Sequence, residues 1–117
     1  QVDAVALSGG DPFLQAAECA ALARAARELA LLAQSGALDP ERITERTLAD
    51  HLYTRGQPDV DLLIRTSGEL RVSNFLLYQA AYAELYFIDV YWPDFDTAQY
   101  ARALQEFAAR NRRYGGV

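Results

Sequence analysis

The sequence contains no methionine and no lysine, and it has a single cysteine and a single histidine. One cysteine, Cys19, excludes an intrachain disulfide and a thiolate metal cluster, which fits a reducing compartment. The sequence lacks both a signal-peptide pattern and a run of about eighteen apolar residues, so we expect a cytoplasmic protein without a membrane span. Because natural chains start with methionine and this one starts with Gln1, we expect its N-terminal end to be processed or truncated.

The charge balance is acidic, with a net charge of -5 at pH 7. A general nucleic-acid binder needs a basic surface to neutralise phosphates, so we expect no nucleic-acid partner. All 11 basic residues are arginine, and each cationic contact is therefore a planar, permanently charged guanidinium suited to phosphate or carboxylate. A length of 117 residues with 51% hydrophobic side chains is enough for one core and predicts a single domain.

Short apolar segments alternate with helical segments along the chain. We expect strands over 2–7, 61–65 and 85–90. We expect helices over 13–34, from 44 or 47 to about 52, from 73 to about 81, and from 96 or 97 to about 110. The helix over 13–34 is apolar on more than one face, so we expect it to pack on two sides. This alternation predicts the α/β class, with a parallel sheet flanked by helices.

The polar segment 65–73 follows an expected strand and precedes an expected helix. Ligands of open α/β sheets bind at this edge, where strands end. Arg65 and Arg71 lie there with hydroxyls, a glycine and a helix N-terminus, and these are the parts of an anion site. The alternative is that both arginines pair with the nearby carboxylates, Glu69 and Asp61, on the surface.

Three other features carry weaker signals. Glu84 lies in an apolar and aromatic stretch, where a carboxylate needs an arginine or a metal as partner unless it faces water. The tail over 110–116 is basic and follows the last expected helix, whose end at arginine the helix dipole alone would favour. The glycine turn after Ser8 lacks the lysine of a P-loop, and we assign no role to His51, which we expect to be a solvated helix residue.

Five spaced segments occur in a fixed order along the chain. They are Asp61–Glu69, Arg71 with Ser73–Leu77, Ala81–Phe87, Trp92–Phe95, and Arg112–Gly116. This order resembles the cis-prenyltransferase family, of which undecaprenyl diphosphate synthase is a bacterial member. Residues 38–116 match well and residues 1–37 match poorly. The chain therefore resembles the C-terminal half of a cis-prenyltransferase fold, as a single, incomplete domain over 1–117.

The resemblance implies a specific reaction. The family condenses isopentenyl diphosphate with an allylic diphosphate, such as farnesyl diphosphate, to a polyprenyl (undecaprenyl-type) diphosphate, and it requires Mg²⁺. The implied substrate-binding residues are Arg65, Arg71, Ser73, Arg113 and Gly115. The first three of these would hold the diphosphate of isopentenyl diphosphate, and the last two would reach across a homodimer interface. Glu84 would organise the metal, often from the neighbouring subunit.

One part of the family pattern is missing. The family's catalytic aspartate lies in an Asp-Gly-Asn motif near its N-terminus, and nothing in this chain corresponds to it. The resemblance thus implies an enzyme for which this chain supplies no catalytic residue. The alternative is a non-catalytic, diphosphate-binding partner subunit of a heteromeric prenyltransferase, although such partners tend to lose the arginines and the serine that are present here. We also expect transient contact with a membrane surface when a lipid product leaves.

Overall fold

The computed structural model describes residues 2–8 and 12–110. Contacts within the chain divide it into two compact units. The sheet unit comprises residues 1–12 and 58–117, and the helical unit comprises residues 13–57. Our expectation of one domain over 1–117 stays a prediction.

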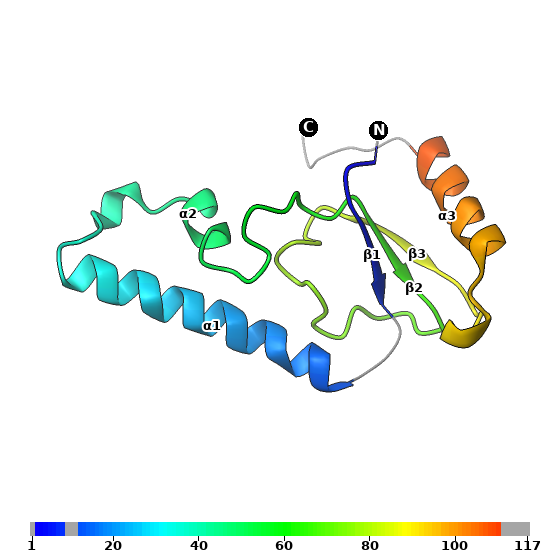
Figure 1. Cartoon of the computed structure of the whole chain (residues 1–117), viewed down its shortest axis with the longest axis horizontal. Coiled ribbons are helices and arrows are strands. Elements are labelled where there is room, and N and C mark those ends of the chain that lie inside the picture. Colours follow the sequence, from blue (N-terminus) through cyan, green and yellow to red (C-terminus); the bar gives the residue numbers. More distant parts are fainter. Residues whose placement is uncertain (1, 9–11, 111–117) are drawn as a thin grey trace. The chain divides into compact units, whose positions relative to one another are not determined.

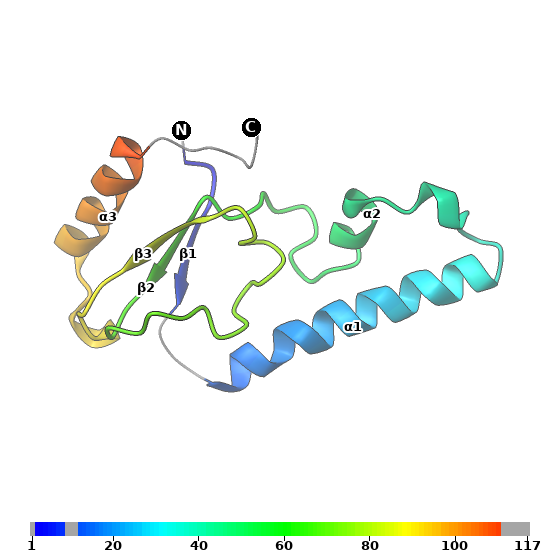
Figure 2. The same ribbon diagram turned by 180° about the vertical axis from the view of Figure 1, so that it is seen from behind.

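The sheet unit is built on three short parallel strands (Figures 1 and 2). They are β1 (Val5–Ser8), β2 (Leu62–Arg65) and β3 (Glu84–Phe87), in the spatial order β1-β2-β3. β2 is buried along its whole length because it lies between the other two strands. The predicted parallel sheet is confirmed, and its parallel pairing brings the carboxyl ends of β1 and β2 together.

One face of the sheet is covered by α3 (Thr97–Ala109), which Figure 1 shows beside the strands. The core on this face consists of Leu62, Ile64, Tyr86, Ala103 and Phe107. The helix begins at a capping box, in which Asp96 accepts bonds from Ala98 N and Gln99 N while the Gln99 side chain accepts from Asp96 N. The predicted helix start at residues 96 and 97 is therefore confirmed.

The opposite face of the sheet is covered by the segment 72–83. Its apolar side chains pack against Ala6, Val60 and Leu63. The helix that we predicted from Ser73 to about residue 81 is wrong, because the segment forms successive turns instead. Ser73, Asn74 and Leu76 have positive φ angles of 51°, 67° and 45°, which a right-handed helix cannot accommodate. Packing of the segment onto the sheet prevails here over helical propensity.

The helical unit begins with α1 (Pro12–Gln34), as the sequence predicted for residues 13–34. Between residues 19 and 34 a single stripe is buried, formed by Ala21, Ala25 and Leu29 at a spacing of four. Leu31 is 58% exposed, so the expectation of packing on two sides is wrong for this part of the helix. Apolar composition alone suggests two buried faces, but the buried residues lie on one face of the helix.

The second helix of this unit, α2 (Glu45–Ala49), is shorter than predicted. Thr44 caps its start, because the Thr44 hydroxyl accepts from Thr47 N and the Thr47 hydroxyl accepts from Thr44 N. From His51 onward the backbone bonds span three residues instead of four, which ends the α-helix before the expected position near residue 52. In the described part of the chain, no helix combines the length and apolar character needed to cross a membrane.

Candidate functional site

Two polar side chains meet where β1 and β2 end. Ser8 is the last residue of β1 and Arg65 the last residue of β2, and the parallel register places them side by side. Arg65 Nη1 donates a hydrogen bond to Ser8 Oγ at 2.8 Å. Since side chains alternate along a strand, both residues lie on the sheet face of Ala6 and Leu63, which segment 72–83 covers. The structure therefore places Arg65 on the face of the sheet that the segment containing Ser73 covers.

The guanidinium of Arg65 is buried and only partly satisfied. Arg65 is 6% exposed, and its Nε has no hydrogen-bond partner among the described residues. The ion pairs of the described residues involve other arginines. The next residue, Thr66, is fully buried, and its hydroxyl also lacks a described partner. The described residues supply no carboxylate to this buried cation, and such a cation is costly unless an anion completes it. This edge therefore has the chemistry of an anion site.

The loop after Arg65 is held in a left-handed conformation. Ser67 and Gly68 each have a φ angle of +67°. Their N–H groups donate to Val90 O at 2.9 Å and to Ile88 O at 3.1 Å. These two N–H groups are therefore occupied and are not free to bind an anion. A helix N-terminus is absent too, because turns replace the helix expected from residue 73. Side chains, and not these two amides, are left to bind an anion.

Arg71 differs from Arg65 in its surroundings. The Arg71 guanidinium pairs with Glu69 at 2.7 Å, and its side chain is 67% exposed. Surface pairing, the alternative to an anion site, is thus observed for Arg71, whereas no described carboxylate pairs with Arg65. The Asp61 carboxylate accepts from Asp3 N and Ala4 N. An exposed pair opens at little cost, so Arg71 remains available to a stronger anion.

Glu84 lies away from this edge, at the start of β3 and beside Leu62. It is separated from the carboxyl end of β2 by three residues, which is about 10 Å at the rise of a strand. By alternation it also lies on the face that α3 covers, and there Arg110 Nη1 donates to Glu84 Oε2 at 3.0 Å and to Leu85 O at 2.8 Å. Within one copy of the chain, Glu84 and Arg65 are therefore not brought together.

A magnesium ion would need oxygen ligands at this site. Mg²⁺ in proteins takes one or two carboxylates together with substrate phosphates and water. Glu84 is one carboxylate and is already paired with Arg110. The described ranges contain no group of three histidine, cysteine or acidic residues arranged to hold a metal ion. These described residues of one chain do not form a magnesium site by themselves.

Two of the predicted binding residues, Arg113 and Gly115, lie outside the described residues. Sequence reasoning also missed two partners that the structure reveals. The sequence offers only a weak glycine turn after Ser8, and the helix dipole alone accounts for Arg110 at the end of a helix. The register of β1 beside β2 is the signal that would have paired Ser8 with Arg65.

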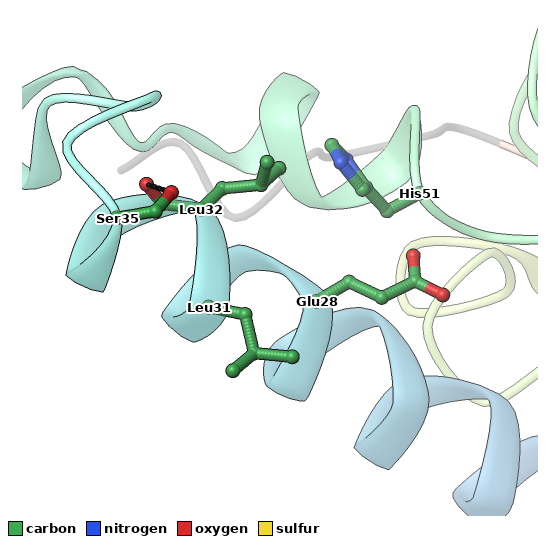
Figure 3. Close-up of a pocket in the computed structure, with 5 residues that line it drawn as sticks. All are labelled: Glu28, Leu31, Leu32, Ser35 and His51. Atoms are coloured by element: carbon green, nitrogen blue, oxygen red, sulfur yellow. Dashed lines mark hydrogen bonds between the residues drawn. The ribbon is translucent and has the colours of Figure 1, made fainter.

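A separate hollow of about 590 Å³ lies in the helical unit (Figure 3). It is lined by Glu28, Leu31, Leu32, Ser35 and His51. His51 is half-buried in the turn after α2, and its Nδ1 donates to Thr47 O at 2.8 Å, so the prediction of a solvated helix residue is wrong. The lining is mainly apolar, and these side chains do not form an arrangement of nucleophile, base and orienting group.

The chain is similar in sequence to known prenyl diphosphate synthases. The sequence model of the prenyltransferase family described as undecaprenyl diphosphate synthase matches residues 14–115, and so extends into the part expected to match poorly. Isoprenyl transferase 1 of Streptomyces coelicolor is 55% identical over 98 residues, which are 84% of this chain and 35% of that protein. Decaprenyl diphosphate synthase of Mycobacterium leprae is 55% identical over 96 residues, which are 82% of this chain and 32% of that protein.

A solved structure shares the fold. Lavandulyl diphosphate synthase from Lavandula x intermedia, in complex with dimethylallyl diphosphate, superposes with a TM-score of 0.77 at 40% identity, over 82% of this chain and 42% of that chain. The chain spans about a third of the length of the curated relatives, 35% and 32% for the two named above. Because the family match covers most of the residues, the chain belongs to the undecaprenyl diphosphate synthase family.

Proposed function

We propose that the full-length protein is a cis-prenyltransferase. It condenses isopentenyl diphosphate with an allylic diphosphate, such as farnesyl diphosphate, and produces a polyprenyl diphosphate of the undecaprenyl type. Family membership supports transfer of a prenyl group, and the names of the two relatives are those of prenyl-transferring enzymes. The alternative of a non-catalytic partner subunit is not favoured, because relatives with enzyme names match most of this chain.

The observation that carries the proposal is the buried guanidinium of Arg65. This guanidinium lies at the carboxyl edge of a parallel sheet. Its Nη1 donates a hydrogen bond to Ser8 Oγ, and its Nε has no partner among the described residues. A diphosphate offers several charged oxygens, which match the planar fork of an arginine. In the proposed function Arg65, Arg71 and Ser73 bind the diphosphate of isopentenyl diphosphate and orient its double bond toward the allylic substrate.

The proposal includes a homodimer. One copy of the chain keeps Glu84 and Arg65 on different faces of the sheet, so their joint action on one substrate requires a second copy. In the proposed dimer, Glu84, Arg113 and Gly115 act on the site of the neighbouring subunit. Mg²⁺ is the proposed cofactor, and it would neutralise charge on the diphosphates. Cytoplasmic location and transient contact with a membrane surface remain expectations from the family.

The experiment compares Arg65→Ala with Arg102→Ala in the full-length protein. Arg102 is a matched control, because its side chain is 73% exposed and forms only a loose pair with Glu106 at 3.7 Å. The assay follows labelled isopentenyl diphosphate into polyprenyl product with farnesyl diphosphate as acceptor, and with dimethylallyl diphosphate as a second acceptor. We expect Arg65→Ala to lower kcat/KM by roughly 10²-fold or more, as for loss of one buried charged partner. Arg102→Ala should change it less than about twofold.

Two results would contradict the proposal. The first is a wild-type protein that forms no product with either acceptor. The second is an Arg65→Ala protein with the same turnover as Arg102→Ala, which would remove the role of the buried guanidinium. Circular dichroism of both variants shows whether each is folded, so that a loss of activity is assigned to the site.

A further inference from the structure

We infer that Ser8 is a positioning residue for Arg65. The Ser8 hydroxyl fixes the orientation of the guanidinium before a diphosphate binds. This inference rests on the proposed function for its substrate and deepens it by adding a residue that lies outside the family match, which begins at residue 14. Ser8 is thus a contribution of this chain's own β1 to the site.

The position of the Ser8 hydroxyl is fixed by the backbone. Ser8 and Arg65 are direct neighbours in the parallel register of β1 and β2, and the ladder continues with Thr66 N donating to Ser8 O at 3.1 Å. Ser8 is 4% exposed and Arg65 is 6% exposed, so water does not replace their contact. At 2.8 Å, the bond from Arg65 Nη1 to Ser8 Oγ is short and charge-assisted.

The contact selects one orientation of a long and flexible side chain. An arginine binds diphosphate best through its planar fork, and the fork works only when the plane is aligned. With Nη1 held by Ser8, the plane is set and Nε stays without a described partner. Orientation before binding lowers the entropy lost when the substrate arrives. The hydroxyl therefore acts through Arg65 and need not touch the substrate.

The test compares Ser8→Ala, Ser8→Thr and Ser35→Ala in the full-length protein. Ser8→Thr keeps the hydroxyl. Ser35→Ala is a matched control because the Ser35 hydroxyl donates to Leu32 O in the last turn of α1 and lies in the helical unit, whereas Arg65 belongs to the sheet unit. The probe for binding is inorganic pyrophosphate, measured by calorimetry. We expect Ser8→Ala to weaken pyrophosphate binding and to raise the KM for isopentenyl diphosphate by roughly 5- to 30-fold, as for loss of one partner of a buried charged group. The KM for the allylic substrate should stay within about twofold, because its diphosphate is not held by Arg65 in the proposed site.

A spectroscopic readout separates positioning from support of the fold. In arginine-labelled ¹⁵N spectra, the Nε–H signal of Arg65 is identified by its loss in Arg65→Lys. We expect this signal to be sharp in the wild type and in Ser8→Thr, and to broaden or exchange faster in Ser8→Ala. If the methyl group added in Ser8→Thr prevents folding, the comparison of Ser8→Ala with the wild type still decides the question.

The possible outcomes lead to different conclusions about Ser8 and about the proposed function. Unchanged pyrophosphate binding and an unchanged Arg65 signal in Ser8→Ala would overturn the inference and leave the proposed function intact. An equal rise in both KM values would assign Ser8 a merely structural role and would also overturn it. A wild type that binds pyrophosphate in a Ser8-dependent way but forms no prenyl product would contradict the proposed function and support the positioning role.

Discussion

Replacing Arg110 by alanine should destabilise the sheet unit by a predictable amount. Arg110 Nη1 donates to Glu84 Oε2 at 3.0 Å and to Leu85 O at 2.8 Å, and so ties the end of α3 to the start of β3. The Arg110 side chain is 33% exposed and the Glu84 side chain 29% exposed, so solvent screens the ion pair. The pair therefore contributes at most about 1 kcal/mol to stability. The bond to the carbonyl adds about 1 kcal/mol, as for a typical net hydrogen bond. We expect a total loss of about 1–2 kcal/mol.

Urea unfolding measures this loss, and a double-mutant cycle assigns it. The cycle combines Arg110→Ala with Glu84→Gln, and we expect a coupling of about 0.5–1 kcal/mol between the two residues. In thermal unfolding, Arg110→Ala should lower Tm by about 4–8 °C for a domain of this size. Arg102→Ala serves as the control, because its pair with Glu106 is exposed, and it should cost less than about 0.5 kcal/mol.

The reasoning would be refuted if Arg110→Ala and Arg102→Ala gave the same free energy of unfolding. A coupling of zero with a full loss on Arg110→Ala would show that the bond to Leu85 O carries the effect alone. That result would also mean that Glu84 is not held by Arg110 and is available to a metal or substrate without first leaving a partner.

Three further predictions concern single side chains. Gly56→Ala should cost about 1 kcal/mol in urea unfolding because its φ is positive and its surroundings are open. Gly68→Ala should cost more than Gly56→Ala, because its Cβ would also lie 2.9 Å from Asp89 Oδ1. An equal cost would mean that the Asp89 side chain simply moves away. Asp96→Ala should cost about 0.5–2 kcal/mol by removal of the capping box of α3, measured the same way, and no change would contradict the cap. Arg71→Ala should leave Tm within about 2 °C yet lower kcat/KM tenfold or more, since its pair is exposed; unchanged turnover would exclude Arg71 from the site.

Much of the sheet unit could be predicted from local pattern. The strand at 62–65 is a short apolar run between polar neighbours, and the start of α3 is marked by a capping residue at 96. The segment 73–81 could not be predicted in this way. Its residues favour a helix locally, but in the structure their apolar side chains cover one sheet face in successive turns, which only tertiary packing determines.

The candidate site was predictable in composition but not in geometry. The sequence placed Arg65 at the carboxyl end of a strand, and the structure agrees. Sequence spacing could not show that Arg65 is buried while Arg71 is exposed, because burial depends on which strand is central. Nor could it show that Ser8 is the neighbour of Arg65, since their contact spans 57 positions of the chain. Long-range register is the information that a single sequence lacks.

The separation of Arg65 from Glu84 makes the proposed dimer testable by complementation. If each site takes Arg65 from one subunit and Glu84 from the other, a heterodimer of Arg65→Ala and Glu84→Gln contains one fully intact site and one site that lacks both groups. Random pairing makes half of the dimers mixed, so co-expression of the two inactive variants should restore about a quarter of the wild-type turnover. If both residues serve the site of their own subunit, every site in the mixture carries one defect and turnover stays at the level of the single variants. Arg65 and Glu84 lie on neighbouring strands, are offset by about 10 Å along the strand direction, and face opposite sides of the sheet. Two such side chains of the same chain do not converge on one small diphosphate, and we therefore expect co-expression to restore turnover.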